Sequence, residues 1–165
     1  MSRAVLSIGS NMGDRLANLQ SVATAFSPYL IGVSPVYRTP PWGPVKQDDY
    51  LNAVLIVDDE DALPMEWLHR ANAAEAAAGR TRDTRWGPRT LDVDVITVDE
   101  QISDNPALTL PHPRAAERAF VLVPWLVLEP GATLPGRGPV ASLLAAIPVA
   151  EVEQIVLIPE AVLHA

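Results

Sequence analysis

The stretch TLDVDVITV, Thr90 to Val98, decides the fold, because its alternation of polar and apolar residues is typical of a half-buried β-strand. Three earlier segments, residues 4–8, 31–39 and 51–57, are rich in branched apolar residues and are also expected to be strands. The stretch at 90–98 is then the fourth strand. The fold class depends on which elements connect these four strands.

Two helices are expected between these strands. Over residues 16–26 apolar residues recur at helical spacing, after a turn in which Asn11 or Asp14 can cap the helix. Pro64 suits the start of a second helix, and an alanine-rich stretch follows until Gly79 ends it. The order β-α-β-β-α-β predicts an α+β fold, a ferredoxin-like split βαβ sheet with helices packed on its faces. Beyond it, we expect a short helix near residues 116–128 and one more strand near 154–158.

The length, composition and net charge of the chain limit the class of protein. A chain of 165 residues is expected to form one domain, residues 1–165. Without cysteine, disulfides and thiolate sites are excluded, and a cytoplasmic location is expected. Its apolar runs are shorter than a membrane span, and its start does not lead into a signal peptide. Because the net charge is -8, we expect no nucleic-acid partner. A monomer with small-molecule partners and no membrane contact is also expected.

Asp92 and Asp94 alternate with apolar residues, so on a strand both carboxylates point to one face, with α-carbons about 6.5 to 7 Å apart. Such a pair can hold divalent metal ions, and magnesium prefers oxygen ligands of this kind. A bare Asp-x-Asp also fits an acidic, half-solvated strand face. The residues just before the pair favour a polyphosphate site, because guanidinium groups bind phosphate through paired hydrogen bonds. These arginines are Arg80, Arg82, Arg85 and Arg89.

The arginines lie in the segment 79–89, which has glycine, proline and no apolar period. A loop of this length favours a functional interpretation, such as a lid over a phosphate chain. The alternative is a solvated loop with surface ion pairs to Asp83 or Glu75. A P-loop is excluded, because the turn at residues 9–14 lacks Gly-Lys-Ser/Thr and the sole lysine is Lys46.

Further side chains suit a phosphate and a flat heterocycle. His112 lies between two prolines, which restrict the direction of its ring, and Arg118 follows six residues later. Contact with phosphate is one interpretation of His112, and a structural histidine is the other. Tyr50, Asn52 and Phe120 offer aromatic faces and an amide that a heterocycle can use, although core packing is the default for both aromatics.

Four segments together resemble one enzyme family, the 6-hydroxymethyl-7,8-dihydropterin pyrophosphokinases. They are RWGPRTLDVDVI at 85–96, SIGSN at 7–11, YRTPPWGP at 37–44 and YLN at 50–52, and the resemblance extends over residues 6–130. It implies transfer of the diphosphate of ATP to the pterin hydroxymethyl group, with attack at the β-phosphorus and release of AMP, in folate biosynthesis. It also implies two magnesium ions, with ATP as co-substrate.

The resemblance implies roles for individual residues. The catalytic residues would be Arg80, Arg89, Asp92 and Asp94, of which Asp92 and Asp94 would bind the metal. The ATP-binding residues would be Glu75, Arg82, Trp86, Arg89, His112 and Arg118. The pterin-binding residues would be Thr39, Pro40, Trp42, Tyr50, Asn52 and Phe120. Residues 39–49 and 79–89 would be loops that close over the substrates. The chain departs from the family pattern at Asn72, Ala107 and Pro113.

Two other hypotheses remain open from the residues alone. A nucleotidyltransferase or nuclease using the same Asp-x-Asp would release inorganic pyrophosphate or cleaved nucleic acid, where a pyrophosphokinase releases AMP. A non-catalytic ferredoxin-like ligand-binding module would bind nucleotide without any dependence on metal.

Overall fold

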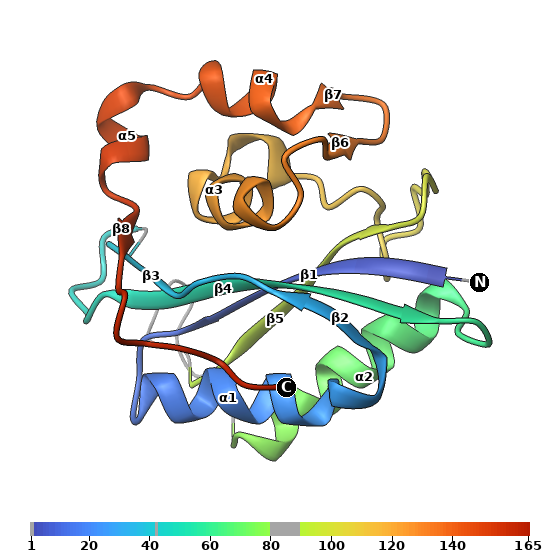
Figure 1. The fold of residues 1–165 in the computed structure, drawn as a ribbon, viewed down its shortest axis with the longest axis horizontal. Helices are drawn as coiled ribbons and strands as arrows, with labels where there is room; N and C mark the ends of the chain where they lie inside the picture. Colours follow the sequence, from blue (N-terminus) through green and yellow to red (C-terminus); the bar gives the residue numbers. More distant parts are fainter. Residues whose placement is uncertain (1, 42, 80–89) are drawn as a thin grey trace.

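The computed structural model describes residues 2–41, 43–79 and 90–165. Its strands, α-helices and 3-10 helices (η) follow in the order β1 (Ser2–Ser10), α1 (Arg15–Ala25), η1 (Ser27–Tyr29), β2 (Leu30–Val33), β3 (Tyr37–Thr39), β4 (Tyr50–Asp59), α2 (Pro64–Ala77), β5 (Asp92–Val98), η2 (Ala115–Glu117), α3 (Ala119–Leu128), β6 (Thr133–Leu134), β7 (Gly138–Pro139), α4 (Val140–Ala145), α5 (Val149–Glu153) and β8 (Val156–Leu157). They form three layers, with one large sheet between two layers of helices (Figure 1).

The large sheet is antiparallel throughout. Its strands lie in the order β5-β1-β4-β3-β8, and β2 also pairs with β4. β1 and β4 pair over the whole length of β1, from Ser2 opposite Asp59 to Ser10 opposite Leu51. Both strands are buried over most of their length because helices cover the two faces of the sheet. The predicted α+β fold, a sheet with helices packed on its faces, is confirmed, although three strands and not two lie between α1 and α2.

α1 and α2 cover one face of the sheet (Figure 1). α1 begins after Asp14, whose carboxylate accepts a hydrogen bond from Ala17 N at 3.0 Å. α2 begins with Pro64 and is followed by Gly79, where φ is +73°. Because glycine adopts this left-handed conformation without steric cost, it ends the helix as expected. Trp67, fully buried, lies in the core between these helices and the sheet.

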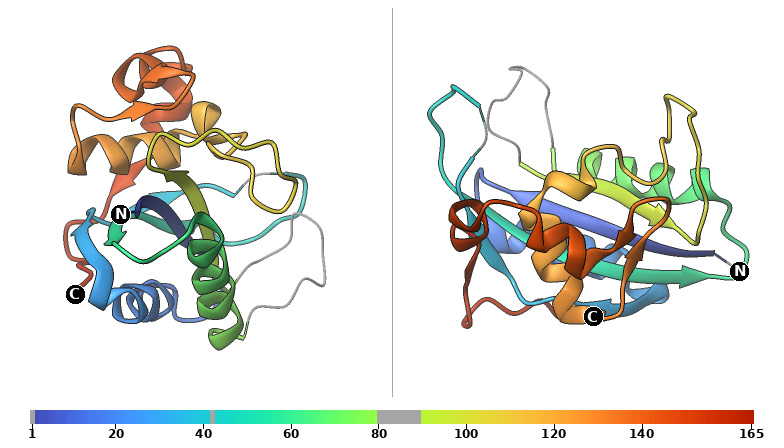
Figure 2. Two further views of the ribbon diagram at one scale, coloured as in Figure 1. Left: turned by 90° about the vertical axis from the view of Figure 1, so that its right-hand side faces the viewer. Right: turned by 90° about the horizontal axis from the view of Figure 1, so that it is seen from above.

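α3, α4 and α5 cover the opposite face, as the two views of Figure 2 also show. A second core there joins Val54 and Ile96 of the sheet to Leu122 and Trp125 of α3. The helix expected near 116–128 is divided by Arg118, whose extended backbone separates η2 from α3. Within the described ranges no helix has the length and apolarity needed to cross a bilayer.

The prediction of one continuous strand at 31–39 was wrong, because two separate strands, β2 and β3, lie there. Pro35 has no N–H to give to a ladder. Ser34 forms two hydrogen bonds with Val54, donating from its N at 2.9 Å and accepting at its Oγ at 2.8 Å. The chain is therefore tied to β4 at this point while regular pairing is interrupted. The strand expected at 154–158 is shorter, β8, and it pairs with β3.

Candidate active site

Three neighbouring strands bring an amide, a glycine and an acid into one row near one end of the sheet. Gly9 of β1 lies opposite Asn52 of β4 on one side and opposite Asp92 of β5 on the other. Directly opposed residues of antiparallel strands point to the same face. Val54, two residues after Asn52, packs in the α3 core, so this row faces α3. Asp94, opposite Ser7, points to the same face.

Arg118 approaches Asp94 from the α3 side. Its Nη1 lies 3.7 Å from Asp94 Oδ2, and its guanidinium carbon lies 5.5 Å from the centre of the Phe120 ring. The Asp94 side chain is 40% exposed and that of Arg118 is 23% exposed. A long ion pair in contact with water contributes little to stability. Arg118 can therefore turn from Asp94 to another anion with little loss of free energy.

His112 is held beside β5 by its own backbone. Its N donates to Ile96 O at 2.8 Å, and its Nδ1 accepts from Arg114 N at 3.2 Å. Burial lowers the pKa of His112 to about 4, with further lowering by the charges of Arg118 and Arg114. The ring is therefore neutral at pH 7. With Nδ1 accepting, the proton of the neutral ring lies on Nε2, which makes Nε2 a hydrogen-bond donor.

Asn52 is one of the few buried polar side chains, with 3% of its surface exposed. Its Nδ2 donates to Thr39 Oγ1 at 2.6 Å. A β-carbon at Gly9 would lie 2.7 Å from Asn52 Oδ1 and 3.4 Å from Tyr50 Cδ1. Gly9 thus leaves the space that both side chains occupy. The structure brings Thr39, Tyr50 and Asn52 together, while Phe120 belongs to α3 on the same side of the sheet.

The turn after β1 anchors the loop between β3 and β4. Asn11 is 2% exposed, and its Nδ2 donates to Gln47 Oε1 at 2.7 Å and to Asp48 O at 3.0 Å. Arg15 Nη1 donates to Asp49 O at 2.9 Å. Sequence reasoning missed this role and treated Asn11 as a possible helix cap. The available signal was the presence of Asn11 in the family motif SIGSN.

The same turn is tied to the residue that leads into β5. Asn18 Nδ2 donates to Met12 O and to Thr90 O, both at 3.0 Å, and to Ser10 Oγ at 3.2 Å. Asn18 was also missed, because nothing in its helical position distinguishes it from a solvent-facing residue. Together with Asn11, it connects one turn to the entry points of β4 and β5, on which the predicted site residues lie.

Glu75 lies on α2, on the far side of β5 from α3. It is 7% exposed, and its Oε1 accepts a hydrogen bond from Val93 N at 3.2 Å. Val93 stands between Asp92 and Asp94 on the outermost strand of the path β5-β1-β4-β3-β8. Glu75 therefore supports the strand that carries both acids.

Fewer structural details are available for the other predicted site residues. Pro40 directly follows β3 and is partly buried. The rest lie outside the described residues, and their roles stay predictions. They are Trp42, Arg80, Arg82, Trp86 and Arg89.

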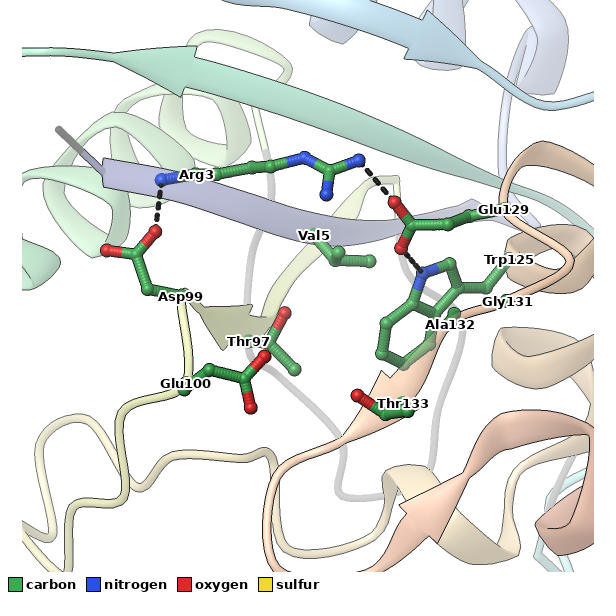
Figure 3. A pocket seen from close by; sticks show the side chains of 10 residues that line it. All are labelled: Arg3, Val5, Thr97, Asp99, Glu100, Trp125, Glu129, Gly131, Ala132 and Thr133. Carbon is green, nitrogen blue, oxygen red and sulfur yellow. Dashed lines mark hydrogen bonds and ion pairs between the residues drawn. The ribbon is translucent and has the colours of Figure 1, made fainter.

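A hollow of about 370 Å³ lies on the α3 face at the other end of β1 (Figure 3). Arg3 forms an ion pair with Glu129 there, and Glu129 also accepts from Trp125 Nε1 at 3.2 Å. Arg3 precedes Gly9 by six residues along the strand, so the hollow is separate from the row of Asn52 and Asp92. Of the predicted site residues that the structure describes, none lines it.

Comparison with known proteins bears on what this site does. Residues 5–130, most of the chain, match the family described as 7,8-dihydro-6-hydroxymethylpterin-pyrophosphokinase (HPPK).

The chain belongs to the HPPK family.

Curated relatives agree with this assignment. The 2-amino-4-hydroxy-6-hydroxymethyldihydropteridine pyrophosphokinase of Mycobacterium tuberculosis (strain ATCC 25618 / H37Rv) is 52% identical over 157 residues, which cover 88% of this chain and 84% of the relative. The protein of the same name from Pseudomonas aeruginosa is 38% identical over 159 residues, covering 94% of this chain and 98% of the relative.

Solved structures share the fold. Wild-type Plasmodium falciparum HPPK-DHPS superposes with a TM-score of 0.66 at 12% identity, covering 87% of this chain and 44% of that one. The A437G variant with pteroate gives a TM-score of 0.68, also at 12% identity, over 87% of this chain and 42% of that one. The chain thus spans less than half of each of these longer proteins, and at such identity the likeness supports the fold alone.

Membership of the HPPK family confirms the expected activity. The chain is a transferase of folate biosynthesis, a pyrophosphokinase with ATP as co-substrate and 6-hydroxymethyl-7,8-dihydropterin as acceptor. The three departures from the family pattern, at Asn72, Ala107 and Pro113, are all exposed in the HPPK fold. They therefore leave its two cores unchanged.

Proposed function

We propose that the HPPK reaction takes place on the sheet face beneath α3, with the pterin held at Asn52 and the triphosphate of ATP at Asp92 and Asp94. The observation that carries this proposal is the row Asn52, Gly9 and Asp92 across β4, β1 and β5. Strands are spaced about 4.8 Å apart, so the amide and the acid stand about 10 Å apart across two spacings. That separation suits a flat bicyclic ring held at one end with its hydroxymethyl group directed toward the phosphates.

Asp92 and Asp94 are the residues proposed to hold magnesium, as two ions. Within the described part of the chain, no group of three or more His, Cys, Asp or Glu side chains could hold a metal ion. A pair of carboxylates fits magnesium, which is commonly bound through one or two carboxylates with phosphate oxygens and water as the other ligands. When bound, magnesium would neutralise charge on the phosphate oxygens.

Arg118 and His112 are proposed to bind the phosphates directly. Arg118, loosely paired with Asp94, exchanges that carboxylate for a phosphate oxygen. The neutral ring of His112 donates from Nε2, so it adds a hydrogen bond without adding a full positive charge. The remaining nucleotide-binding residues are proposed from the family resemblance. They are Glu75, Arg80, Arg82, Trp86 and Arg89.

Asn52 is proposed to bind the edge of the pterin, because an amide pairs with neighbouring donor and acceptor groups. Tyr50 and Phe120 are proposed to stack on its ring. Thr39, Pro40 and Trp42 complete the proposed pterin contacts. Since Asn52 Nδ2 already donates to Thr39 Oγ1, the orientation of the amide is restricted before substrate binds.

The chemical step then depends on how the protein positions the two substrates, more than on covalent catalysis by the protein. A bond forms between the pterin hydroxymethyl oxygen and the β-phosphorus, and the bond from that phosphorus to the oxygen of the α-phosphate breaks. AMP leaves with the electron pair of the broken bond, and the hydroxyl proton is lost to solvent or phosphate. No protein nucleophile is required.

A product assay tests the proposal. The purified chain is mixed with ATP, magnesium chloride and 6-hydroxymethyl-7,8-dihydropterin, and nucleotides are separated by chromatography. We expect AMP and the pterin diphosphate in equal amounts, and no AMP when the pterin is omitted. Release of inorganic pyrophosphate would instead indicate nucleotidyl transfer and overturn the proposal.

Other expectations remain proposals beside the activity. We propose that residues 1–165 form one domain that acts as a monomer in the cytoplasm and binds no nucleic acid. The lack of cysteine and the net charge of -8 support the location and the absence of nucleic acid. Light scattering coupled to size exclusion tests the monomer, because a dimer would double the mass of 17.8 kDa.

A further inference from the structure

β3, which carries Thr39, has only three residues but is paired on both sides. β4 pairs with it along its full length. On the other side β8 places Leu157 opposite Tyr37, and just beyond it Ile158 N donates to Val36 O at 3.0 Å. A strand this short is marginal when only one neighbour holds it. The pairing with β8 therefore restrains β3 where it leads into the loop before β4.

β8 is not held by its own side chains. Val156, for example, is 40% exposed. The residues that follow enter the core around α1, where Ala161 is 6% exposed and Leu163 is 7% exposed. Gln20 of α1 then bonds the main chain of His164 in both directions, donating to its O at 2.7 Å and accepting from its N at 2.9 Å.

We call residues 155–164 the strap, because they cross the edge of the sheet from one helical layer to the other. In Figure 1 the red trace leaves α5 above the sheet, passes β3 as β8 and ends beside α1 below it. At its upper end, Ile155 packs against the core under α3. Both helical layers therefore hold the strap, and the strap holds β3.

The side chain of Asn52 is joined to β3 by one short hydrogen bond. Thr39, the last residue of β3, accepts the 2.6 Å hydrogen bond from Asn52 Nδ2. On its other side the amide lies over Gly9. An amide held between a hydroxyl and a backbone has one orientation only while both stay in place. The position of β3 thus determines the orientation of the Asn52 amide.

We propose that the strap is a positioning element of the pterin site, which holds β3 so that Thr39 fixes the Asn52 amide in its pterin-binding orientation. The inference rests on the proposed function, in which Asn52 binds the pterin. Asp92 and Asp94 lie on β5, at the opposite edge of the sheet from β8. Loosening the strap is therefore expected to weaken pterin binding and leave ATP binding unchanged.

Two variants loosen the strap without touching β3. Gln20→Ala removes both bonds to His164, and Leu163→Ala removes a buried side chain. Calorimetry and steady-state kinetics give the dissociation constant and KM of each substrate. We expect both constants for the pterin to rise about three- to tenfold, the range that one or two ordinary hydrogen bonds represent. The constants for ATP stay at the wild-type values.

Leu134→Ala is the matched control. Leu134 is 1% exposed and lies in β6, which pairs with β7 in a separate small sheet, so its truncation is equally large but touches neither β3 nor β8 pairing. We expect it to lower the melting temperature without changing the ratio of pterin to ATP affinity. If Leu163→Ala and Leu134→Ala shift the two substrates alike, the positioning role is wrong. Gln20→Ala, which creates no cavity in the core, gives the same test if Leu163→Ala fails to fold.

A double-mutant cycle separates this inference from the proposed function. In an Asn52→Ala background the strap variants should no longer affect pterin affinity, because their effect passes through the amide. If Asn52→Ala leaves pterin affinity at the wild-type value, the proposed pterin site fails and the inference falls with it. If Asn52→Ala weakens the pterin but the strap variants do not, only the positioning role is overturned.

Discussion

The side-chain amide of Asn52 occupies the space beside Gly9, so a β-carbon built at Gly9 would stand 2.7 Å from Asn52 Oδ1. Real β-carbons essentially never approach another atom so closely, and the atom they would meet belongs to a buried side chain. Gly9 is required here for the space it leaves, since its φ does not lie in the left-handed region. The finding links the glycine of the SIGSN motif to the amide on the neighbouring strand.

Gly9→Ala should displace the Asn52 amide and raise the dissociation constant of the pterin by about tenfold or more, with little effect on ATP. Calorimetry with each substrate measures the change. Gly32→Ala is the matched control, because a β-carbon at Gly32 in β2 meets Leu128 at an ordinary 3.5 Å. Wild-type pterin affinity in Gly9→Ala would show that the amide does not bind the substrate.

Asp94→Asn should remove the dependence of ATP binding on magnesium, because it neutralises one of the two proposed ligands. We expect turnover to fall by about 100-fold or more, equivalent to about 2.7 kcal/mol. The fold should be kept, since the Asp94 side chain is 40% exposed. Calorimetry of ATP binding with magnesium and with EDTA gives a readout other than activity. Asp104→Asn, at an exposed position, is the control, and equal magnesium dependence in both variants would refute the role.

The pKa of His112, lowered to about 4 from 6.5 chiefly by burial, makes stability depend on pH. Between these values the unfolded chain binds a proton that the folded chain does not. The stability contributed by neutral His112 is therefore fully present above pH 6.5 and is lost as the pH falls through 4. Urea unfolding of His112→Gln should show a smaller loss across this window than the wild type does.

An NMR titration checks the same prediction directly. The ring signals of His112 should change with a midpoint near pH 4, and a midpoint near 6.5 would contradict the buried, neutral ring.

Glu75→Ala should lower the free energy of unfolding by about 1–3 kcal/mol, because it leaves the N–H of Val93 without the acceptor seen here. Glu75→Gln keeps an acceptor oxygen and should cost less. Glu66→Ala, exposed on the same helix, is the control. Urea denaturation measures all three variants. Equal stability of Glu75→Ala and Glu66→Ala would show that the bond to β5 contributes nothing.

Much of the fold could be predicted because it follows from local patterns. Helical spacing over residues 16–26 and the alternation of 90–98 correspond to α1 and β5 within a few residues. The break between β2 and β3 was missed, since the branched residues on both sides of Pro35 suggested one strand. Asn11 and Asn18 were missed as anchors because their partners lie in distant loops, and spacing along one segment says nothing about such contacts.

The alternation of Asp92 and Asp94 with valines determined by itself that both acids share one face of a strand, because successive side chains point to opposite faces. Which face that is, and which residues stand beside them, was decided only by the tertiary structure. The register of β1 against β4 and β5 places Asn52, Gly9 and Asp92 in one row. Register depends on burying two apolar faces of the whole sheet at once, so no single segment of the sequence contains it.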